Sequence, residues 1–247
     1  IKPDEIITAD IDFAATHCTR QKRLFLCDGD ALIIPQQRLV SILEQIREKL
    51  PWLERIGVYA NTKGIMRKTS QELEELKNLG LGIAYLGLES GDDVTLAAIQ
   101  KGADSARFIE MGRKIRAAGI KLSITVLLGI AQKTRSAIHA KETGRVLSAI
   151  DPEFVGALSL MLTPNTLLHQ QWVDKNWYLL NAEEMLEELG IMFAATELSN
   201  GYFHANHASN YLPIKAKLPE DKQKILSLIS QALAGKINLK PEHLRGL

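Results

Sequence analysis

The chain has 247 residues, of which 46% are apolar and 24% are charged, as in an ordinary globular protein with a substantial core. Its 30 Lys and Arg almost balance its 29 Asp and Glu, so charge gives no reason to expect a nucleic-acid or anionic-membrane partner. No apolar run approaches the roughly 20 residues of a membrane-spanning helix, and the first residues lack the pattern of a signal peptide. We therefore expect a cytoplasmic protein. The two cysteines, Cys18 and Cys27, are too few for a disulfide framework and predict reduced, buried thiols.

An amphipathic helix is predicted from about residue 4 to residue 17, before any strand. After it, five apolar runs recur about 30 residues apart and alternate with helix-like stretches, which is the spacing of βα units. The predicted strands are residues 23–27, 55–60, 82–88, 121–128 and 154–162. The predicted helices between them are residues 39–50, 70–80, 105–119 and 134–150.

The order of these elements predicts an α/β fold with a parallel sheet. Thr69 or Ser70 is the expected cap of the second of these helices, and Gly80 is its expected stop. The strands are continuous apolar runs, so both faces of the sheet are expected to be covered. Because a βα series normally begins with a strand, we expect a first strand and its loop to be missing, which leaves a partial (βα)6 barrel.

Beyond about Pro164 the βα pattern ends. Helices are predicted at residues 181–195 and about 219–234, and the polar segment 198–214 is predicted to be a turn. We expect two parts, a barrel over residues 1–168 and a mainly helical C-terminal extension over residues 169–247 that packs on it.

Five polar loops follow the five strands. They are residues 28–32, 61–65, 89–93, 128–132 and 163–166. In parallel α/β folds ligands bind at the carboxyl ends of the strands, so these loops are expected to share one end of the sheet. Glu89 and Ser90 suit ribose hydroxyls or an ammonium group, and Asp28 or Asp30 could bind a cationic amine. Several carboxylates with little basic charge favour a cationic or polyhydroxylated ligand over a phosphate.

Other polar residues have simpler interpretations. Asp92 or Asp93 could serve only as a helix N-cap. His139 is expected at the surface or behind the site. His204 and His207 form an HxxH spacing without an acidic or thiol partner, so a structured loop held by Asn and Ser side chains is favoured over a metal site. Trp52, Trp172 and Trp177 are scattered along the chain and indicate packing.

The ordered motifs FLCDGDAL, VYANTKGI, YLGLESGDD with Lys101-Gly102 beyond it, ITVLLGI and LMLTPNTLL resemble the radical S-adenosylmethionine (radical SAM) superfamily. The nearest branch is that with elongator-like radical SAM domains, which includes oxidoreductases of unknown substrate. The resemblance covers about residues 1–168, and HANHASNYLP (204–213) resembles a tail in part of this branch.

The resemblance implies contacts to SAM. Asp28, Gly29 and Asp30 would replace the motif that binds the methionine amine, and Asn61 matches the polar residue that ends the next strand. Glu89 and Ser90 match the ribose-binding pair. The backbone at Thr125, Leu127 and Gly129 would lie beside the adenine, and Met161 and Leu162 would touch the adenine or the substrate. No catalytic residue and no metal ligand is assigned.

Two departures from the family stand out. DGDA at 28–31 replaces the commoner GGEP, and the CxxxCxxC loop that binds a 4Fe-4S cluster is absent. Three thiolates hold three of the four irons, and the fourth iron chelates SAM. Cys18 and Cys27 are nine residues apart and cannot substitute, so the cluster ligands are expected upstream of Ile1.

The resemblance implies a radical SAM oxidoreductase that cleaves SAM reductively at the cluster and abstracts hydrogen from a small-molecule or unidentified substrate. An electron donor for the cluster is the expected partner, and this chain alone is expected to be inactive. Two alternatives stay open. One is a barrel enzyme that binds a polyol or an amine without SAM, and the other is an inactive binding or scaffold barrel.

Overall fold

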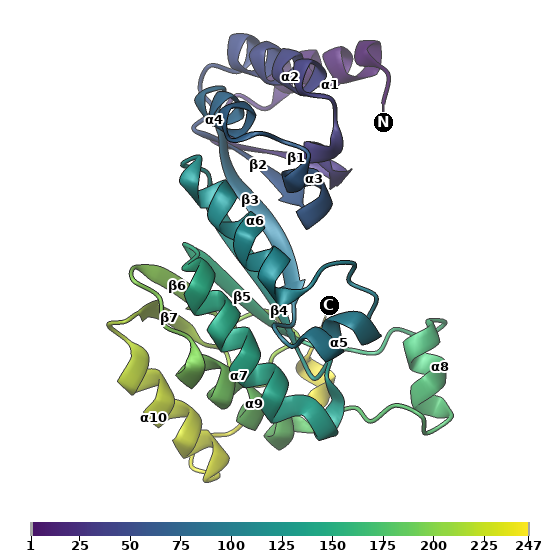
Figure 1. The fold of residues 1–247 in the computed structure, drawn as a ribbon, viewed down its shortest axis with the longest axis vertical. Coiled ribbons are helices and arrows are strands. Elements are labelled where there is room, and N and C mark those ends of the chain that lie inside the picture. The colour runs from purple at the N-terminus through teal and green to yellow at the C-terminus, as the bar shows by residue number, and fades with distance from the viewer. Residues whose placement is uncertain (1, 247) are drawn as a thin grey trace. The chain divides into compact units, whose positions relative to one another are not determined.

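A computed structural model describes residues 2–246, apart from the side chain of Asp28. Helices and strands alternate along most of the chain (Figure 1). The chain divides into two compact units, which we name the first unit (Ile1–Leu86 and Glu110–Leu122) and the second unit (Gly87–Ile109 and Ser123–Leu247). Of the helices in the described part of the chain, none has the length and apolarity needed to cross a membrane.

The first unit contains parallel strands with helices packed beside them. β1 pairs with β2 and β2 pairs with β3, both in parallel. α1 and α2 lie side by side (Figure 1). The elements are α1 (Asp4–His17), β1 (Arg23–Asp30), the 3-10 helix η1 (Ala31–Ile33), α2 (Gln36–Lys49), β2 (Arg55–Ala60), α3 (Thr62–Met66), α4 (Ser70–Asn78), β3 (Leu81–Glu89) and α6 (Ser105–Ala117). The last residues of β3 and the first residues of α6 belong to the second unit.

The predicted helix boundary at residue 69 is confirmed. The Thr69 hydroxyl accepts a hydrogen bond from Glu72 N–H, and the Glu72 carboxylate accepts one from Thr69 N–H, which makes a capping box. Gly80 follows the helix with a φ of 102°, a conformation that glycine adopts without a steric penalty. The helix therefore ends where the sequence predicts.

The second unit contains parallel strands that end in an antiparallel pair. β4 pairs with β5 and β5 with β6 in parallel, whereas β6 and β7 are antiparallel. α7 packs against α9, and α9 packs against α10. The elements are α5 (Asp93–Ala98), β4 (Lys121–Leu128), α7 (Gln132–Ile150), β5 (Phe154–Ser159), α8 (Leu167–Val173), α9 (Ala182–Ala195), β6 (Gly201–His204), β7 (Lys215–Leu218), α10 (Lys222–Leu233) and the 3-10 helix η2 (Glu242–Leu244).

The two faces of the strands differ in burial. In β4, Leu122, Ile124, Val126 and Leu128 are buried, whereas the residues between them are half-buried or half-exposed, and β5 alternates in the same way. The expectation that both faces are covered is therefore wrong. Side chains at every second position stay open to solvent because the helices cover one face only. We name this half-exposed side of β4 and β5, together with Gly87 and Glu89 at the end of β3, the open face of the second unit.

The predicted fold class, an α/β partial barrel built on a parallel sheet, is confirmed, and the sheet of the described residues is not a closed barrel. Three elements differ from the sequence prediction: β6 lies within the predicted turn 198–214, and neither β7 nor α8 was predicted. Since β6 pairs directly with β5, this C-terminal segment extends the strands of the second unit. The predicted division at residue 168 stays a prediction.

Candidate functional site

Glu89 ends β3 with its side chain on the open face. Its φ of 62° lies in the left-handed region, which few residues other than glycine adopt. Its Oε1 forms an ion pair of 3.1 Å with Lys101 Nζ, and the two side chains are 25% and 27% exposed. Gly87 leaves room for this pair, because a Cβ there would lie 2.5 Å from Glu89 Oε1. The strand end therefore presents a carboxylate, anchored by one lysine, to the open face.

Ser90 lies inside the second unit and not on the open face. Its side chain is fully buried, and its Oγ lies 2.8 Å from His139 Nδ1 and accepts a hydrogen bond from Asp92 N–H at 3.0 Å. The left-handed backbone at Glu89 separates the directions of these two neighbouring side chains. The structure thus places only one member of the predicted ribose-binding pair where a ligand could reach it.

Asp92 and Asp93 are structural, as the simpler interpretation of the sequence predicts. Asp92 is the N-cap of α5 and accepts two hydrogen bonds of 2.8 Å from Arg135. The Arg135 guanidinium holds the pKa of the Asp92 carboxyl well below its usual range. Asp93 accepts a hydrogen bond from Ser105 N–H at the start of α6. Both carboxylates are therefore used to fix the loop after β3.

Thr125 and Leu127 lie half-exposed on the open face of β4. The parallel register aligns Thr125 with Gly156 and Leu127 with Leu158 of β5, and the side chains of all these residues belong to the same face. Gly156 lacks a side chain, and Leu127 and Leu158 are apolar. These residues form a shallow, mainly apolar surface that suits the flat face of a nucleobase.

Gly129 follows β4 with a φ of 82°. Its N–H donates a hydrogen bond of 2.7 Å to Glu188 Oε1, and a Cβ at this position would lie 2.5 Å from Met185 Cε. Gly129 is buried, and its backbone N–H is already used inside the protein.

Met161 and Leu162 lie in the segment between β5 and α8 and are half-buried. β5 ends at Ser159 and not at Leu162 as predicted, so neither residue belongs to the strand.

Two further predicted residues come together in the first unit. Asp30 accepts a hydrogen bond from Leu32 N–H at 3.0 Å, and burial raises the pKa of its carboxyl. Its Oδ2 is buried without a hydrogen-bond partner among the described residues and lies over Gly64, where a Cβ would be 2.0 Å away. Asn61 caps α3 by accepting a hydrogen bond from Gly64 N–H.

The remaining residues of the predicted amine-binding motif are Gly29 and Asp28. Gly29 has a φ of 113° and is exposed. The side chain of Asp28, also predicted to bind the amine, lies outside the described residues.

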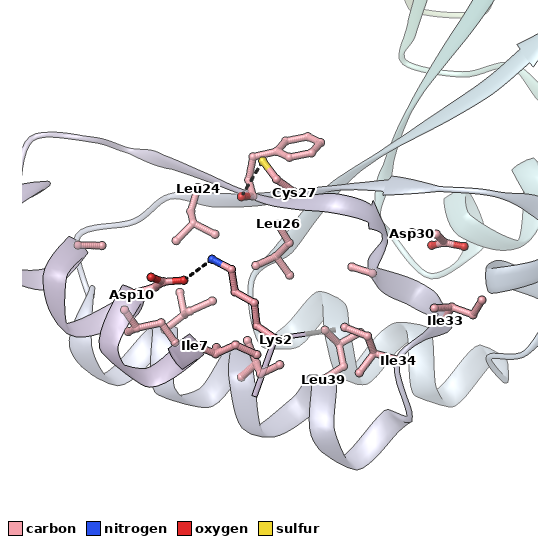
Figure 2. A pocket seen from close by; sticks show the side chains of 16 residues that line it. Lys2, Ile7, Asp10, Leu24, Leu26, Cys27, Asp30, Ile33, Ile34 and Leu39 are labelled. Carbon is pink, nitrogen blue, oxygen red and sulfur yellow. Dashed lines mark hydrogen bonds and ion pairs between the residues drawn. The ribbon is translucent and has the colours of Figure 1, made fainter. Parts of the chain in front are cut away.

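The first unit also contains a cavity of about 430 Å³ (Figure 2). Leu24 and Leu26 point from β1 toward the helices on its far side, Asp30 lies at one end, and Lys2 forms an ion pair of 2.8 Å with Asp10. Most of the lining is aliphatic. Asp30 is the one residue of the predicted SAM site that lines this cavity in the described part of the chain.

Both cysteines are free thiols, but the prediction that they are buried is wrong. Cys27 is exposed and Cys18 is half-buried. β1 is the first strand in the sheet order, and within residues 2–246 no strand pairs with its outer edge, which leaves Cys27 accessible. The described residues contain no group of three or more His, Cys, Asp or Glu side chains that could hold a metal ion. These residues therefore do not fit a 4Fe-4S cluster.

The segment HANHASNYLP forms a structured loop, as predicted. Asn210 Nδ2 donates to Ala157 O at 2.8 Å, Ser159 Oγ donates to Asn210 Oδ1, and Ser209 Oγ accepts from Ser159 N–H. His207 Nδ1 contacts Ser209 Oγ at 3.0 Å, so one of its ring nitrogens is engaged within the loop. The loop binds the end of β5 through hydrogen bonds to backbone and side chain.

His139, predicted at the surface or behind the site, is fully buried and contacts Ser90 from behind. The surface alternative is therefore wrong. Glu188, on α9, is also fully buried beside it. A spacing of four residues puts His139 and Thr143 on one side of α7, but no local pattern in the sequence identifies Glu188 as their neighbour.

Comparison with known proteins identifies the class of protein. The family model of the radical SAM superfamily matches residues 3–139, which is more than half of the chain. The chain therefore belongs to the radical SAM superfamily, whose members normally use SAM and a 4Fe-4S cluster. The prediction of this family from the sequence motifs is confirmed.

Solved structures share the fold at low sequence identity. Coproporphyrinogen III oxidase (HemN) from Escherichia coli matches with a TM-score of 0.60 and 12% identity over 77% of this chain and 44% of that chain. Elp3 from the archaeon Methanocaldococcus infernus matches with a TM-score of 0.58 and 13% identity over 97% of this chain and 59% of that chain. Methylornithine synthase (PylB) has a TM-score of 0.53 and 16% identity over 77% and 54% of the two chains. No curated protein sequence matches this chain. The chain spans about half the length of these structural relatives.

Proposed function

We propose that this chain is the nucleoside-binding part of a radical SAM enzyme and that SAM binds on the open face of the second unit. One observation carries the proposal: the Glu89 carboxylate is held on the open face at the carboxyl end of β3 by a left-handed backbone and by Lys101. Ligands of parallel α/β folds bind at this end of the strands. Membership of the radical SAM superfamily supports SAM as the ligand.

Glu89 would accept hydrogen bonds from the ribose hydroxyls. A carboxylate has about four lone-pair sites, so it can hold two neighbouring hydroxyl groups while it keeps its ion pair with Lys101. Hydrogen bonds to a charged group are stronger than those between neutral groups. Lys101 would keep the carboxylate in one position and so reduce the entropy that is lost on binding.

The surface formed by Thr125, Leu127, Gly156 and Leu158 would support the adenine ring. Burying an apolar surface under a base is favourable, and the missing side chain of Gly156 lets the ring approach the strand. The roles predicted for Asp30 and Asn61 concern the first unit and stay predictions. Ser90 and Gly129 are buried and would act on the site only through the residues that they hold in place.

A bound 4Fe-4S cluster supplies the electron for reductive cleavage of SAM in this superfamily. Because residues 2–246 do not fit a cluster, we propose that its cysteine ligands are supplied by residues outside this range. An electron donor would then be a partner of the complete enzyme. The substrate is one from which hydrogen is abstracted, and its chemical class is left open.

Titration calorimetry tests the binding site. SAM, or S-adenosylhomocysteine as a probe that cannot be cleaved, is expected to bind weakly to this chain, because residues 2–246 contain no group of side chains that could hold the iron that chelates the methionine end. Glu89→Gln should weaken binding about 10- to 100-fold, since it removes a charged hydrogen-bond acceptor worth about 1.5–3 kcal/mol.

Glu74→Gln on α4 is the matched control, because Glu74 is an exposed glutamate outside the site. Its affinity should equal that of the unmodified chain. Equal affinities for the unmodified chain and for Glu89→Gln would exclude the proposed role of Glu89. Binding of simple polyols or amines without binding of either SAM probe would favour a barrel enzyme that does not use SAM.

A further inference from the structure

Four polar side chains form a buried network behind the open face of the second unit. Ser90, His139, Thr143 and Glu188 are each fully buried. Ser90 Oγ lies 2.8 Å from His139 Nδ1, and His139 Nε2 lies 3.4 Å from Glu188 Oε1. Burial of this many polar groups is costly unless they are hydrogen-bonded, and each of the four except His139, at Nε2, has its hydrogen-bonding atoms paired within the unit.

The network reaches the backbone of two different loops. On the side of β3, Thr143 Oγ1 accepts a hydrogen bond from Gly91 N–H at 2.8 Å, and Ser90 Oγ accepts one from Asp92 N–H. On the side of β4, Glu188 Oε1 accepts a hydrogen bond from Gly129 N–H at 2.7 Å. The imidazole of His139 is the group between these two sets of contacts.

The contacts fit an arrangement in which the Ser90 hydroxyl donates to His139. The Ser90 hydroxyl already accepts from Asp92 N–H, so it can donate its own hydrogen to an unprotonated His139 Nδ1. The neutral ring then carries its hydrogen on Nε2, which faces the acceptor Glu188 Oε1. The distance of 3.4 Å is longer than an ordinary hydrogen bond, and Nε2 has no other partner among the described residues. Glu188 Oε1 is therefore the nearest acceptor that the described residues offer to Nε2.

The same three residue types occur in hydrolase triads, but this network cannot act as one. A nucleophilic serine must be accessible to its substrate, and Ser90 is fully buried. Its oxygen also accepts the Asp92 N–H, which fixes it to the backbone of its own loop. The contacts are those of a bridge between two loops.

We propose that His139 is a positioning residue that couples the loop after β3 to the loop after β4. This inference rests on the proposed function, because the two loops follow Glu89 and Leu128, at the strand ends where SAM is proposed to bind. The bridge holds Ser90, and Ser90 follows the left-handed residue Glu89 directly, so the bridge fixes the direction in which the Glu89 carboxylate points. His139 acts on the ligand only through the two loops.

Hydrogen exchange tests the bridge without any ligand. In the unmodified chain the Gly129 amide should be protected by its hydrogen bond to Glu188. Ser90→Ala removes the contact at the far end of the bridge and should lower the protection of the Gly129 amide about tenfold, relative to amides in the middle of β5. Unchanged protection of Gly129 would overturn the proposal, whether or not SAM binds.

Thr95→Val is the matched control. It removes the hydrogen bond from Thr95 Oγ1 to Asp92 Oδ2, which lies in the same loop but does not involve His139. If the substitutions loosened the loop in general, both variants would lower the exchange protection of the Gly129 amide. If the bridge exists, only Ser90→Ala should lower it. Equal loss of Gly129 protection in both variants would therefore also overturn the proposal.

Ligand affinity provides the second readout. Ser90→Ala and Glu188→Gln should each weaken the binding of S-adenosylhomocysteine about tenfold. The double variant should also bind about tenfold more weakly than the unmodified chain, and not about a hundredfold, because both changes interrupt the same bridge. His139→Asn, which places an amide near the position of Nδ1, should keep the contact with Ser90 and retain more affinity than His139→Leu. Additive effects of Ser90→Ala and Glu188→Gln on the binding free energy would contradict a shared bridge.

The two proposals fail separately. Absence of binding in the unmodified chain would refute the proposed function, whereas hydrogen exchange at Gly129 would still show whether the bridge exists.

Discussion

At the scale of single residues, Glu89 and Ser90 show how neighbours can have opposite environments. In an extended strand, consecutive side chains point to opposite faces, and the left-handed backbone at Glu89 adds a turn at that point. Glu89 stays on the open face with Lys101, whereas Ser90 joins His139 in the interior. The motif ESG therefore places one side chain on the open face, where we propose that the ligand binds, and one side chain in the interior, where it supports the loop.

The exposure of Cys27 gives a prediction at the same scale. Cys27 lies on the exposed edge strand β1, and Cys18 is half-buried after α1. A small alkylating reagent in excess should therefore modify Cys27 faster than Cys18, since access limits the rate when two thiols have similar reactivity. Mass spectrometry of peptides over time measures both rates.

Denatured protein is the control for that experiment, because both thiols should then react at similar rates. Equal rates in the folded protein, or faster reaction of Cys18, would contradict the exposure of β1 described above.

At the scale of elements, the C-terminal loop shows that a segment far along the chain supports the end of a strand. Asn210 uses its amide to bond both Ala157 O and Ser159 Oγ of β5. Asn210 is 2% exposed, so water cannot replace these bonds. The loop thereby satisfies polar groups that the end of β5 would otherwise leave buried and unpaired.

Asn210→Ala should lower the free energy of unfolding by about 1–3 kcal/mol, because it leaves the carbonyl of Ala157 and the hydroxyl of Ser159 without a buried partner. Denaturation in urea, followed by circular dichroism, measures the change.

Asn206→Ala in the same loop is the matched control, since Asn206 is exposed, and its effect should lie within about 0.5 kcal/mol of zero. Equal destabilisation by the two variants would show that the loop does not depend on the buried amide.

At the scale of the whole molecule, the described residues include the proposed nucleoside site but no group of side chains that could hold a cluster. Radical SAM chemistry needs both, and residues 2–246 provide candidates for only one. The matched relatives are longer, and this chain covers 44% of HemN and 59% of Elp3. The activity of a complete enzyme is therefore a proposal that goes beyond this chain.

Anaerobic reconstitution with iron and sulfide is expected to leave this chain without a 4Fe-4S cluster. Three thiolates are required, and the chain has two cysteines, nine residues apart. Iron and sulfide analysis after gel filtration measures the outcome, with a radical SAM enzyme that carries the CxxxCxxC motif as the positive control. Four iron and four sulfide per chain would contradict the prediction.

The sequence predicted those parts of the fold that depend on local patterns. The apolar runs gave the strands β1 to β5, and Thr69 with Gly80 gave the limits of α4, because strand periodicity and helix capping involve residues close together in the chain. β6 and β7 were missed because each has four residues and is stabilised by pairing with a distant strand. The burial of Ser90 was missed because it depends on His139 and Glu188, which come from two other helices.

The sequence alone determined the family, the alternation of strands and helices, and the loop that carries Glu89. Each of these depends on a short sequence motif or on the periodic spacing of apolar residues close together in the chain. Only the tertiary structure decided which side of the strands stays open, which member of the pair Glu89–Ser90 faces it, and what lies behind. The physical reason is that burial and hydrogen-bond partners are set by residues far apart in the chain. The packing of α7 against α9 brings His139 and Glu188 together behind Ser90. No local pattern in the sequence predicts this contact.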